Sequence, residues 1–204
     1  GEEATQQAYA DLGDEIVFDL DAARAEMAQS SSPDGVTAEV LVTSSDPTLA
    51  LVVQTAAQSL DEIGIHLKVR EVDDQTYYSA VYFGHDTDGV SIDLFSGSTP
   101  DPANLPLYVI DGDNALTSGG SGVNISDYVN RDVDALLDAS QRLAVDDPER
   151  GAKLLEALAL AQADVPYVPI AFPQVLIAGR DGLDVEALGT FWWMSDWPEA
   201  LVDG

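Results

Sequence analysis

The chain has 204 residues, no cysteine and 46% hydrophobic residues, so it can fold around its own core without disulfides or thiolate metal sites. Its 37 acidic side chains face only 8 Lys and Arg, which gives a formal net charge of -29. Such a charge repels nucleic-acid phosphates and anionic membranes, so we expect neither as a partner. It suits solubility, or a salty or cell-surface setting.

The first part of the chain alternates helix and strand signals. Helical spacing predicts a helix over 20–29, and alternating apolar residues predict a strand over 36–43. An apolar stripe predicts a second helix over 47–63, which Gly64 ends, and alternation predicts a second strand over 65–69. The order strand, helix, strand implies a parallel pair joined by a right-handed crossover.

The middle of the chain is predicted to hold a short helix, a strand and two loops. The helix opens at Asp73 or Asp74 and closes at Gly84. A third strand is predicted over 90–95. Gly, Ser and Pro then predict a loop over 96–106, and a weakly structured loop follows over 111–127.

Two helices follow, and the short break between them implies antiparallel neighbours. The first begins at Asn130 or Asp132, and the second begins at the cap-and-proline pair Asp147–Pro148. Their predicted buried faces carry Val133, Leu136, Leu137 and Leu143 in the first helix, and Leu154, Leu155, Leu158 and Ala161 in the second.

Two further strands are predicted near the end of the chain, over 165–171 and 175–178. Pro166, Pro169 and Pro173 favour edge or irregular positions for them. The predicted fold class is α/β, with a mixed sheet of about five strands flanked by helices. The three tryptophans, Trp192, Trp193 and Trp197, all follow these strands.

The search for catalytic chemistry is largely negative. No GxGxxG or Walker A pattern occurs, and Val123 stands where a nucleophile elbow around Ser121 needs glycine. His66 is expected to face outward from its strand, and His85 lies in an acidic turn where a weak metal site is the alternative. Asn124 begins an N-glycosylation pattern. We expect no enzyme, no metal and no cofactor.

One loop has the composition of a binding site. It follows the third predicted strand and combines an aromatic ring with small polar residues. Ligands of α/β proteins bind at loops after the carboxyl ends of strands. An ordinary connection between a strand and a helix is the alternative. The candidate ligand-binding residues are Phe95, Ser96, Gly97, Ser98, Asp101 and Asn104.

Several motifs follow one another in order along most of the chain. They are Asp19 to Met27, Pro33-Asp34-Gly35, Leu60-Asp61-Glu62-Ile63-Gly64-Ile65, Asp93-Leu94-Phe95, Asp101-Pro102, the set Asn124, Tyr128, Asn130, Val133, Asp134, Leu136 and Leu137, then Asp147 to Arg150, and Val165 to Ile170. In this order they resemble the solute-binding proteins of peptide/nickel-class ABC importers, and in particular their second lobe.

The resemblance implies one lobe of a periplasmic-binding-protein-like fold, in which two lobes close over a ligand and exclude water. It implies residues 1–18 as an extension crossing from a first lobe outside the chain, 19–180 as the lobe, and 181–204 as an extension returning toward the first lobe. The start at Gly1 indicates a trimmed chain. The tryptophans are expected near the junction of the lobes, with burial in this lobe's own core as the alternative.

The resemblance also bears on the site residues. Peptide-binding relatives carry in this loop a carboxylate that pairs with the peptide's amino terminus, and Ser98 stands at that place. Phe95 replaces a Trp common in the family, and Asp101 matches an Asp-Pro carboxylate that is usually structural. The ligand expected is therefore an oligopeptide, a sugar, a metal chelate or another small molecule.

Two functions from different classes follow from the resemblance. The first is the ligand-binding lobe of an extracytoplasmic solute-binding protein, whose partners are the ligand, the first lobe and an ABC permease. The second is a cell-surface lipoprotein of the same fold that has no transport role, binds envelope proteins and regulates cell-wall biosynthesis. The neutral Ser98 favours the second, while the framework motifs fit both.

Overall fold

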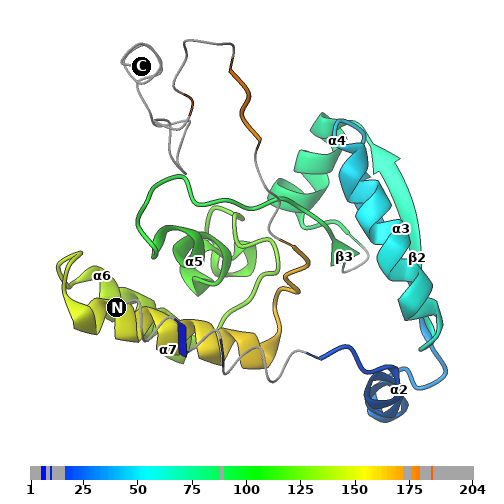
Figure 1. Ribbon diagram of the computed structural model, residues 1–204, viewed down its shortest axis with the longest axis horizontal. Helices are drawn as coiled ribbons and strands as arrows, with labels where there is room; N and C mark the ends of the chain where they lie inside the picture. The colour runs from blue at the N-terminus through cyan, green and yellow to red at the C-terminus, as the bar shows by residue number, and fades with distance from the viewer. Residues whose placement is uncertain are drawn as a thin grey trace.

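The structure is a computed structural model that describes residues 6, 7, 10, 17–87, 90–171, 176–179 and 185. It divides into a sheet half and a helical half, which lie side by side (Figure 1). The sheet half contains α2 (Leu20–Gln29), β1 (Val36–Thr43), α3 (Pro47–Asp61), β2 (Ile65–Val72), α4 (Asp74–Tyr78), the π-helix η1 (Ser79–Gly84) and β3 (Val90–Ser91). The helical half contains α5 (Asn104–Val109), the 3-10 turns η2 (Gly112–Asn114) and η3 (Leu116–Ser118), α6 (Arg131–Gln141) and α7 (Pro148–Asp164).

The described sheet has three parallel strands in the order β2-β1-β3. β1 pairs along its whole length with β2, from Val36 opposite Ile65 to Thr43 opposite Val72. The predicted parallel unit of strand, helix and strand is therefore confirmed. The short β3 pairs with the other edge of β1 through residues 90 and 91.

The second half of the central strand β1 is buried on both faces. Val40 and Val42 pack against Ala50 and Val53 of α3 on one face. Leu41 packs on the other face, in a second cluster with Tyr77 and Val81 of α4 and η1. Helices thus cover both faces of β1, the arrangement that parallel sheets require because both of their faces are apolar.

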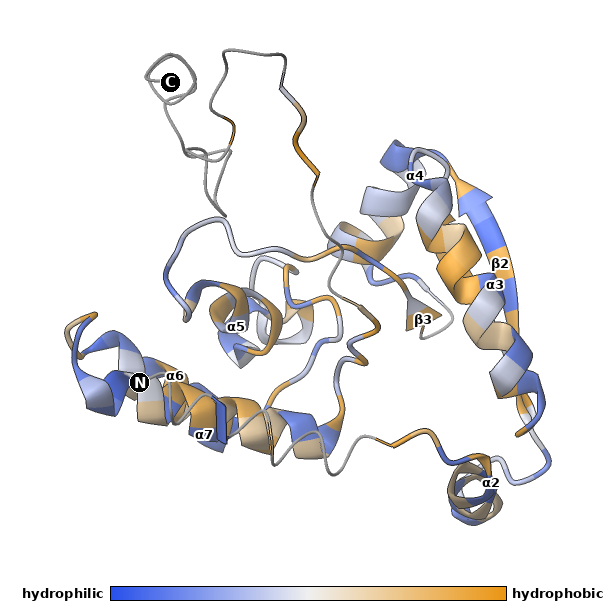
Figure 2. Ribbon diagram, viewed as in Figure 1, coloured by the Kyte–Doolittle hydropathy of each residue, from blue (hydrophilic) through white to orange (hydrophobic). Residues whose placement is uncertain are grey.

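The helical half is built on the antiparallel pair α6 and α7. Asn130 caps α6 by accepting from the amide of Asp132 at 3.0 Å, and Asp147 caps α7 by accepting from the amide of Glu149 at 2.9 Å. Apolar residues gather where the two helices meet (Figure 2). The core of this half consists of Ala103, Ile110, Val133, Leu137, Leu154, Ala157 and Ala161.

The prediction that Leu158 lies on the buried face of α7 is wrong. Leu158 is 41% exposed, and the buried position on that turn of α7 belongs to Ala157. The small Ala157 side chain lets α6 and α7 approach closely, so the larger leucine next to it lies outside the contact.

The prediction of five strands is wrong for the described residues. β3 ends at Ser91 instead of Phe95, and residues 165–171 and 176–178 form no strand. Pro166 and Pro169 lack a backbone N–H, so a β-strand through this segment would lose two hydrogen-bond donors to its neighbour. Val168 and Ile170 are exposed instead of packed against β1–β3.

Some predictions fall on residues that the structure does not describe. Trp192, Trp193 and Trp197 lie outside the described residues, and so does nearly all of the proposed extension 181–204 and most of 1–18. Among the described helices, none combines the length and the apolar character that crossing a membrane requires.

Replacing Leu137 by alanine is expected to destabilise the chain by about 3 kcal/mol, because it leaves a cavity between α6 and α7. Leu137 is 1% exposed. Leu158→Ala is the matched control, and it should cost less than about 1 kcal/mol because Leu158 lies at the surface of the same helix pair. Urea unfolding followed by circular dichroism measures both. Equal losses would contradict the packing described for these helices.

Candidate functional site

The candidate site is the loop of residues 92–103, which leaves the carboxyl end of β3 and crosses to α5 (Figure 1). Because the three strands are parallel, the ends of β1 at Thr43, of β2 at Val72 and of β3 at Ser91 lie along the same edge. Open α/β sheets bind ligands at this edge. The loop is therefore where the fold favours a binding site.

Two tyrosine hydroxyls hold the start of the loop. Tyr77 donates to the carbonyl oxygen of Ile92 at 2.5 Å, and Tyr82 donates to the carboxylate of Asp93. The two tyrosines are five residues apart, and an α-helix would direct them to different sides. The π-helix η1, whose hydrogen bonds join residues five apart, widens the turn that follows Tyr78 and so brings Tyr82 back toward the side of Tyr77. These bonds draw the chain out of the sheet and explain why β3 is short.

Asp93 is a half-buried carboxylate. Burial raises its pKa, while hydrogen bonds from the Tyr82 hydroxyl and the Leu94 amide act in the opposite direction. Burial and the bond to Asp93 together raise the pKa of the Tyr82 hydroxyl, so Tyr82 stays a protonated donor at neutral pH. No described Lys, Arg or His forms an ion pair with Asp93.

A row of aromatic rings runs beside the loop. Tyr78 lies 5.5 Å from Tyr82 between ring centroids, and Tyr82 lies 6.2 Å from Phe95. Phe95 in turn meets Tyr167 edge to face at 6.2 Å. Tyr167 follows α7, so Phe95 joins the sheet half to the helical half by ring contacts on both sides.

The middle of the loop is closed by Asn104, the first residue of α5. Its side-chain oxygen accepts from the Ser98 amide at 2.6 Å and from the Ser98 hydroxyl at 3.1 Å. Ser96 and Ser98 are exposed, and Gly97 between them is half-buried. The bonds from Asn104 thus fold residues 98–104 into a compact turn that presents small polar groups.

The far end of the loop is held by an ion pair. Asp101 binds Arg150 of α7 through both carboxylate oxygens, at 2.8 and 2.9 Å from Nη2. It also accepts from the amide of Ala103 at 2.9 Å. Arg150 is only 3% exposed, so Asp101 supplies the negative charge that a buried guanidinium requires.

The structure therefore places all six predicted residues on one loop but gives them different surroundings. Ser98 and Asn104 contact each other, Phe95 turns toward the aromatic row, and Asp101 turns toward α7. Ser96 and Gly97 lie between them. Ligand binding by these residues stays a prediction.

Sequence reasoning missed five residues that shape the loop: Tyr77, Tyr82, Asp93, Arg150 and Tyr167. Arg150 carried a signal, because it ends the motif Asp147 to Arg150 just as Asp101 begins Asp101-Pro102. Nothing in the sequence indicates that these two motifs meet. Tyr82 carried none, because its role depends on the π-turn.

His85 links the sheet half to the loop that precedes α6. Its Nδ1 lies 2.7 Å from the Asp127 carboxylate, and its Nε2 lies 3.1 Å from the Gly122 carbonyl oxygen. His85 and Asp127 both have positive φ, at 47° and 51°. No cluster of three or more His, Asp or Glu with the arrangement of a metal site occurs in the described part of the chain.

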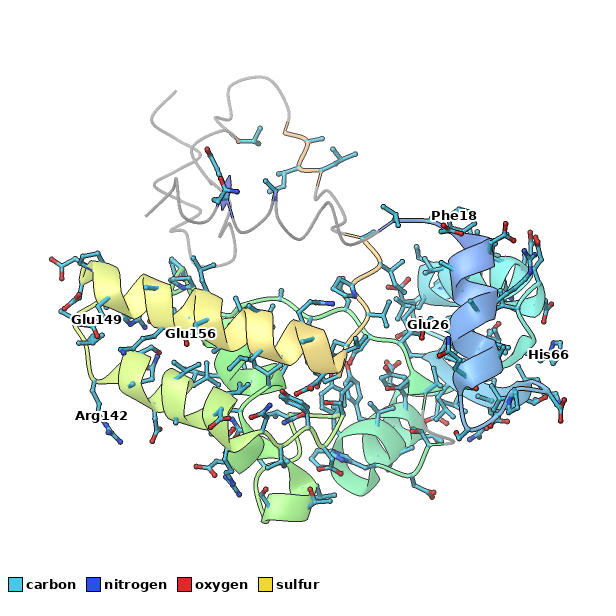
Figure 3. The ribbon with its side chains drawn as sticks, turned by 90° about the horizontal axis from the view of Figure 1, so that it is seen from below. Phe18, Glu26, His66, Arg142, Glu149 and Glu156 are labelled. Atoms are coloured by element: carbon cyan, nitrogen blue, oxygen red, sulfur yellow. The ribbon has the colours of Figure 1, made fainter. Side chains whose placement is uncertain are left out.

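The other candidates have structural surroundings. His66 faces outward as predicted, at the edge of the sheet half, beside Asp61 (Figure 3). Ser121 donates to Asn114 at 3.1 Å and has no base beside it among its described contacts. Asn124 is fully buried and donates to the carbonyl oxygens of Asp111 and Tyr128, so its glycosylation pattern lies on an inaccessible side chain in the folded chain.

Comparison with solved structures gives clear matches. The periplasmic binding protein DppA from Helicobacter pylori, in complex with the peptide STSA, matches with a TM-score of 0.65 and 27% identity over 76% of this chain. The oligopeptide-binding protein AppA from Bacillus subtilis, with a nonapeptide, matches with a TM-score of 0.60 and 17% identity over 74%. NikA from Staphylococcus aureus, with Ni(L-His)2, matches with a TM-score of 0.58 and 20% identity over 72%. The predicted family resemblance is confirmed.

The chain spans only part of these peptide/nickel-class proteins, covering 29% of DppA, 31% of AppA and 30% of NikA. That share corresponds to a single lobe. No protein-family model matches the chain, and no curated protein matches it. The three solved structures hold different ligands, so a fold shared with them does not by itself specify a ligand.

Replacing Asp101 by asparagine is expected to destabilise the chain by about 3 kcal/mol, because it leaves the buried Arg150 charge without a counter-charge. Asp113→Asn is the matched control. Asp113 pairs with Arg131 at 3.4 Å, both side chains are exposed, and the loss should stay below about 1 kcal/mol. Urea unfolding measures both variants. The double variant Asp101→Asn with Arg150→Met should recover part of the loss, and an unchanged loss would contradict the charge argument.

The same pair predicts a pH dependence. The hydrogen bond from the Ala103 amide, with a further contribution from Arg150, holds the pKa of Asp101 below its ordinary value of 3.8, against the effect of burial. A lowered pKa stabilises the fold above the ordinary value, and this contribution is lost as the pH falls through the folded value. The stability difference between the wild type and Asp101→Asn should therefore shrink below about pH 4. Unfolding curves across this range would refute the assignment if the difference stayed constant.

Proposed function

We propose that this chain is the ligand-binding lobe of an extracytoplasmic solute-binding protein that serves an ABC importer. In this proposal the chain forms one wall of a cleft, and a second lobe closes over an oligopeptide or another small solute. The support from known proteins is the shared fold with DppA, AppA and NikA, whose structures hold a peptide, a nonapeptide and a nickel complex.

The observation that carries the proposal is the way in which the loop 92–103 is held. Tyr77 and Tyr82 fasten its start, and Arg150 fastens its end. The exposed hydroxyls of Ser96 and Ser98 lie between these two attachments. A loop fixed in advance loses little conformational entropy when it binds, which is what a capture site needs.

A second candidate is a protein of the same fold that binds envelope proteins and regulates cell-wall biosynthesis without transport. One observation favours it. Ser98 is neutral and already engaged with Asn104, so the loop offers no charged anchor at that position. In this candidate the exposed loop would contact a protein surface instead of enclosing a solute.

The test uses the complete two-lobed protein that the proposal implies. A thermal-shift screen of peptides, sugars and metal chelates, followed by calorimetry, should find a ligand that raises the unfolding midpoint by mass action. Ser98→Ala should then weaken binding by up to about tenfold, the effect of one lost hydrogen bond.

Ser121→Ala is the matched control for this variant. Both serine hydroxyls donate to an asparagine side chain at 3.1 Å, but Ser121 lies on the loop between η3 and α6. The control should leave binding unchanged. A folded protein that binds no member of any ligand class would exclude solute capture and favour the envelope-protein candidate. Substrate turnover abolished by Ser121→Ala would instead establish an enzyme.

A further inference from the structure

The ring of His85 faces two oxygen atoms of the loop that precedes α6. Its Nδ1 lies 2.7 Å from the Asp127 carboxylate, and its Nε2 lies 3.1 Å from the Gly122 carbonyl oxygen. An ionised carboxylate and a carbonyl group only accept hydrogen bonds, whereas a neutral imidazole has one donor nitrogen and one acceptor nitrogen. Both bonds form together only when both ring nitrogens carry a proton. The geometry is therefore that of an imidazolium ion.

The carboxylate beside this ring is ionised and sheltered from water. The side chains of His85 and Asp127 are 10% and 24% exposed. Burial acts to raise the pKa of Asp127, but hydrogen bonds from His85 and from the Thr117 amide hold it below its ordinary value. Among the ion pairs of the described residues, only this one includes Asp127. Each charge of the pair thus depends on the other.

The other titratable groups around His85 are acidic or aromatic. Asp86 follows it in the chain, and Tyr82 lies three residues before it on η1. Tyr167, after α7, has a pKa that burial raises and to which the charge of Asp127 contributes. The pKa of Tyr82 is raised by burial as well, so both hydroxyls stay neutral at neutral pH. The charge that changes near neutral pH is therefore the one on His85.

The backbone at this contact adopts conformations that favour glycine. His85 and Asp127 have φ of 47° and 51°, and Gly122 has φ of 81°. A Cβ atom at Gly122 would lie 2.4 Å from the carbonyl oxygen of Tyr82, so glycine is what lets the loop approach η1 this closely. Left-handed backbone at a residue with a side chain is unfavourable and persists where its surroundings hold it. The bonds of the His85 ring are part of those surroundings.

We infer that His85 forms a pH-dependent contact in which its imidazolium ion holds η1 against Asp127 and Gly122, and that loss of the ring proton loosens it. The same turn η1 carries Tyr82, which holds the start of the candidate loop through Asp93. The His85 contact thereby regulates how firmly the loop 92–103 is fixed. This last step rests on the proposed function, because it treats that loop as the binding site.

The direction of the pH effect follows from the proton that the contact needs. The unfolded chain offers the ring no fixed acceptors, so folding favours the protonated form. This stabilisation is present where imidazole is protonated and is lost as the pH rises past its titration, which in water lies at about pH 6.5. On the acid side, the contact is lost when Asp127 is protonated, at a pH below about 4.

The first experiment observes the ring protons of the 204-residue chain by 1H–15N NMR. At about pH 5.5, where imidazole in water is mostly protonated, both ring nitrogens of His85 should carry a proton. As the pH rises, one proton should be lost, and the amides of Gly122 and Asp127 should shift with the same midpoint. A neutral His85 ring at the lower pH, or loop amides that do not follow the ring, would overturn the inference.

The second experiment compares His85→Gln with His66→Gln in urea unfolding at about pH 5.5 and 8. His66 is the matched control because its Nδ1 also lies 2.7 Å from a carboxylate, that of Asp61, but its side chain is 56% exposed. Relative to His85→Gln, the folding equilibrium constant of the wild type should fall by about tenfold between the two pH values, since a charge-assisted bond is lost. An equal pH effect in the two comparisons would refute a special role for His85.

The effect on the candidate loop has its own readout. In the wild type, amide shifts of residues 92–95 should follow the His85 titration. In His85→Gln that component should disappear, leaving the titration of Asp93, whose pKa is raised by burial. An unchanged profile would show that the contact does not regulate the loop. None of these measurements involves a ligand, so a failure of solute capture would leave the His85 contact standing, and a failure of the contact would leave the proposed function standing.

Discussion

The contact between Asp101 and Arg150 determines where the candidate site can be. The buried guanidinium lies near the start of α7, and its counter-charge comes from a loop that begins at the end of β3. A buried cation tolerates no other arrangement, because separation from its carboxylate would leave a full charge in an apolar environment. The loop therefore reaches from the end of β3 across to α7, and its serines lie between these two points. The position of the site follows from the cost of one unpaired charge.

The opposite end of the loop depends on helix geometry. η1 departs from the α-helical repeat, and this departure lets Tyr77 and Tyr82 hold two successive residues, Ile92 and Asp93. Such turns are less favourable than α-helix and persist where packing supports them. Here Tyr77 and Val81 fill the face of β1 opposite α3. The core on that face thus stabilises the same turn that shapes the loop, which couples the stability of the sheet half to the geometry of the site.

Periodicity and capping signals predicted α2, α3, α6, α7 and the parallel pair well, because each depends on nearby residues. They missed α5 (Asn104–Val109), which begins inside the predicted loop 96–106. Asn130 and Asp147 cap the helices that their positions indicate. The failures have non-local causes. β3 is short because Tyr77, which lies outside the strand, donates a hydrogen bond to the carbonyl oxygen of Ile92. The segment after α7 is apolar like a strand, but it has prolines where a β-ladder needs N–H donors. The six candidate residues lie on one loop, as the sequence indicates. The ion pair, the half-buried carboxylate and the aromatic row join segments far apart in sequence, which no local pattern reveals.

Basic side chains are scarce in this chain, so only a few of its carboxylates can be neutralised by an ion pair. With 37 acidic residues against 8 basic ones, most carboxylates must be compensated by water and counter-ions. An exposed carboxylate without a basic partner costs little stability, because water solvates it. At a half-buried position such as Asp93, solvent cannot fully replace a cationic partner. The buried Arg150 pairs with Asp101 instead. The result is a loop with one carboxylate neutralised by an arginine of the same chain and one that has only neutral hydrogen-bond donors.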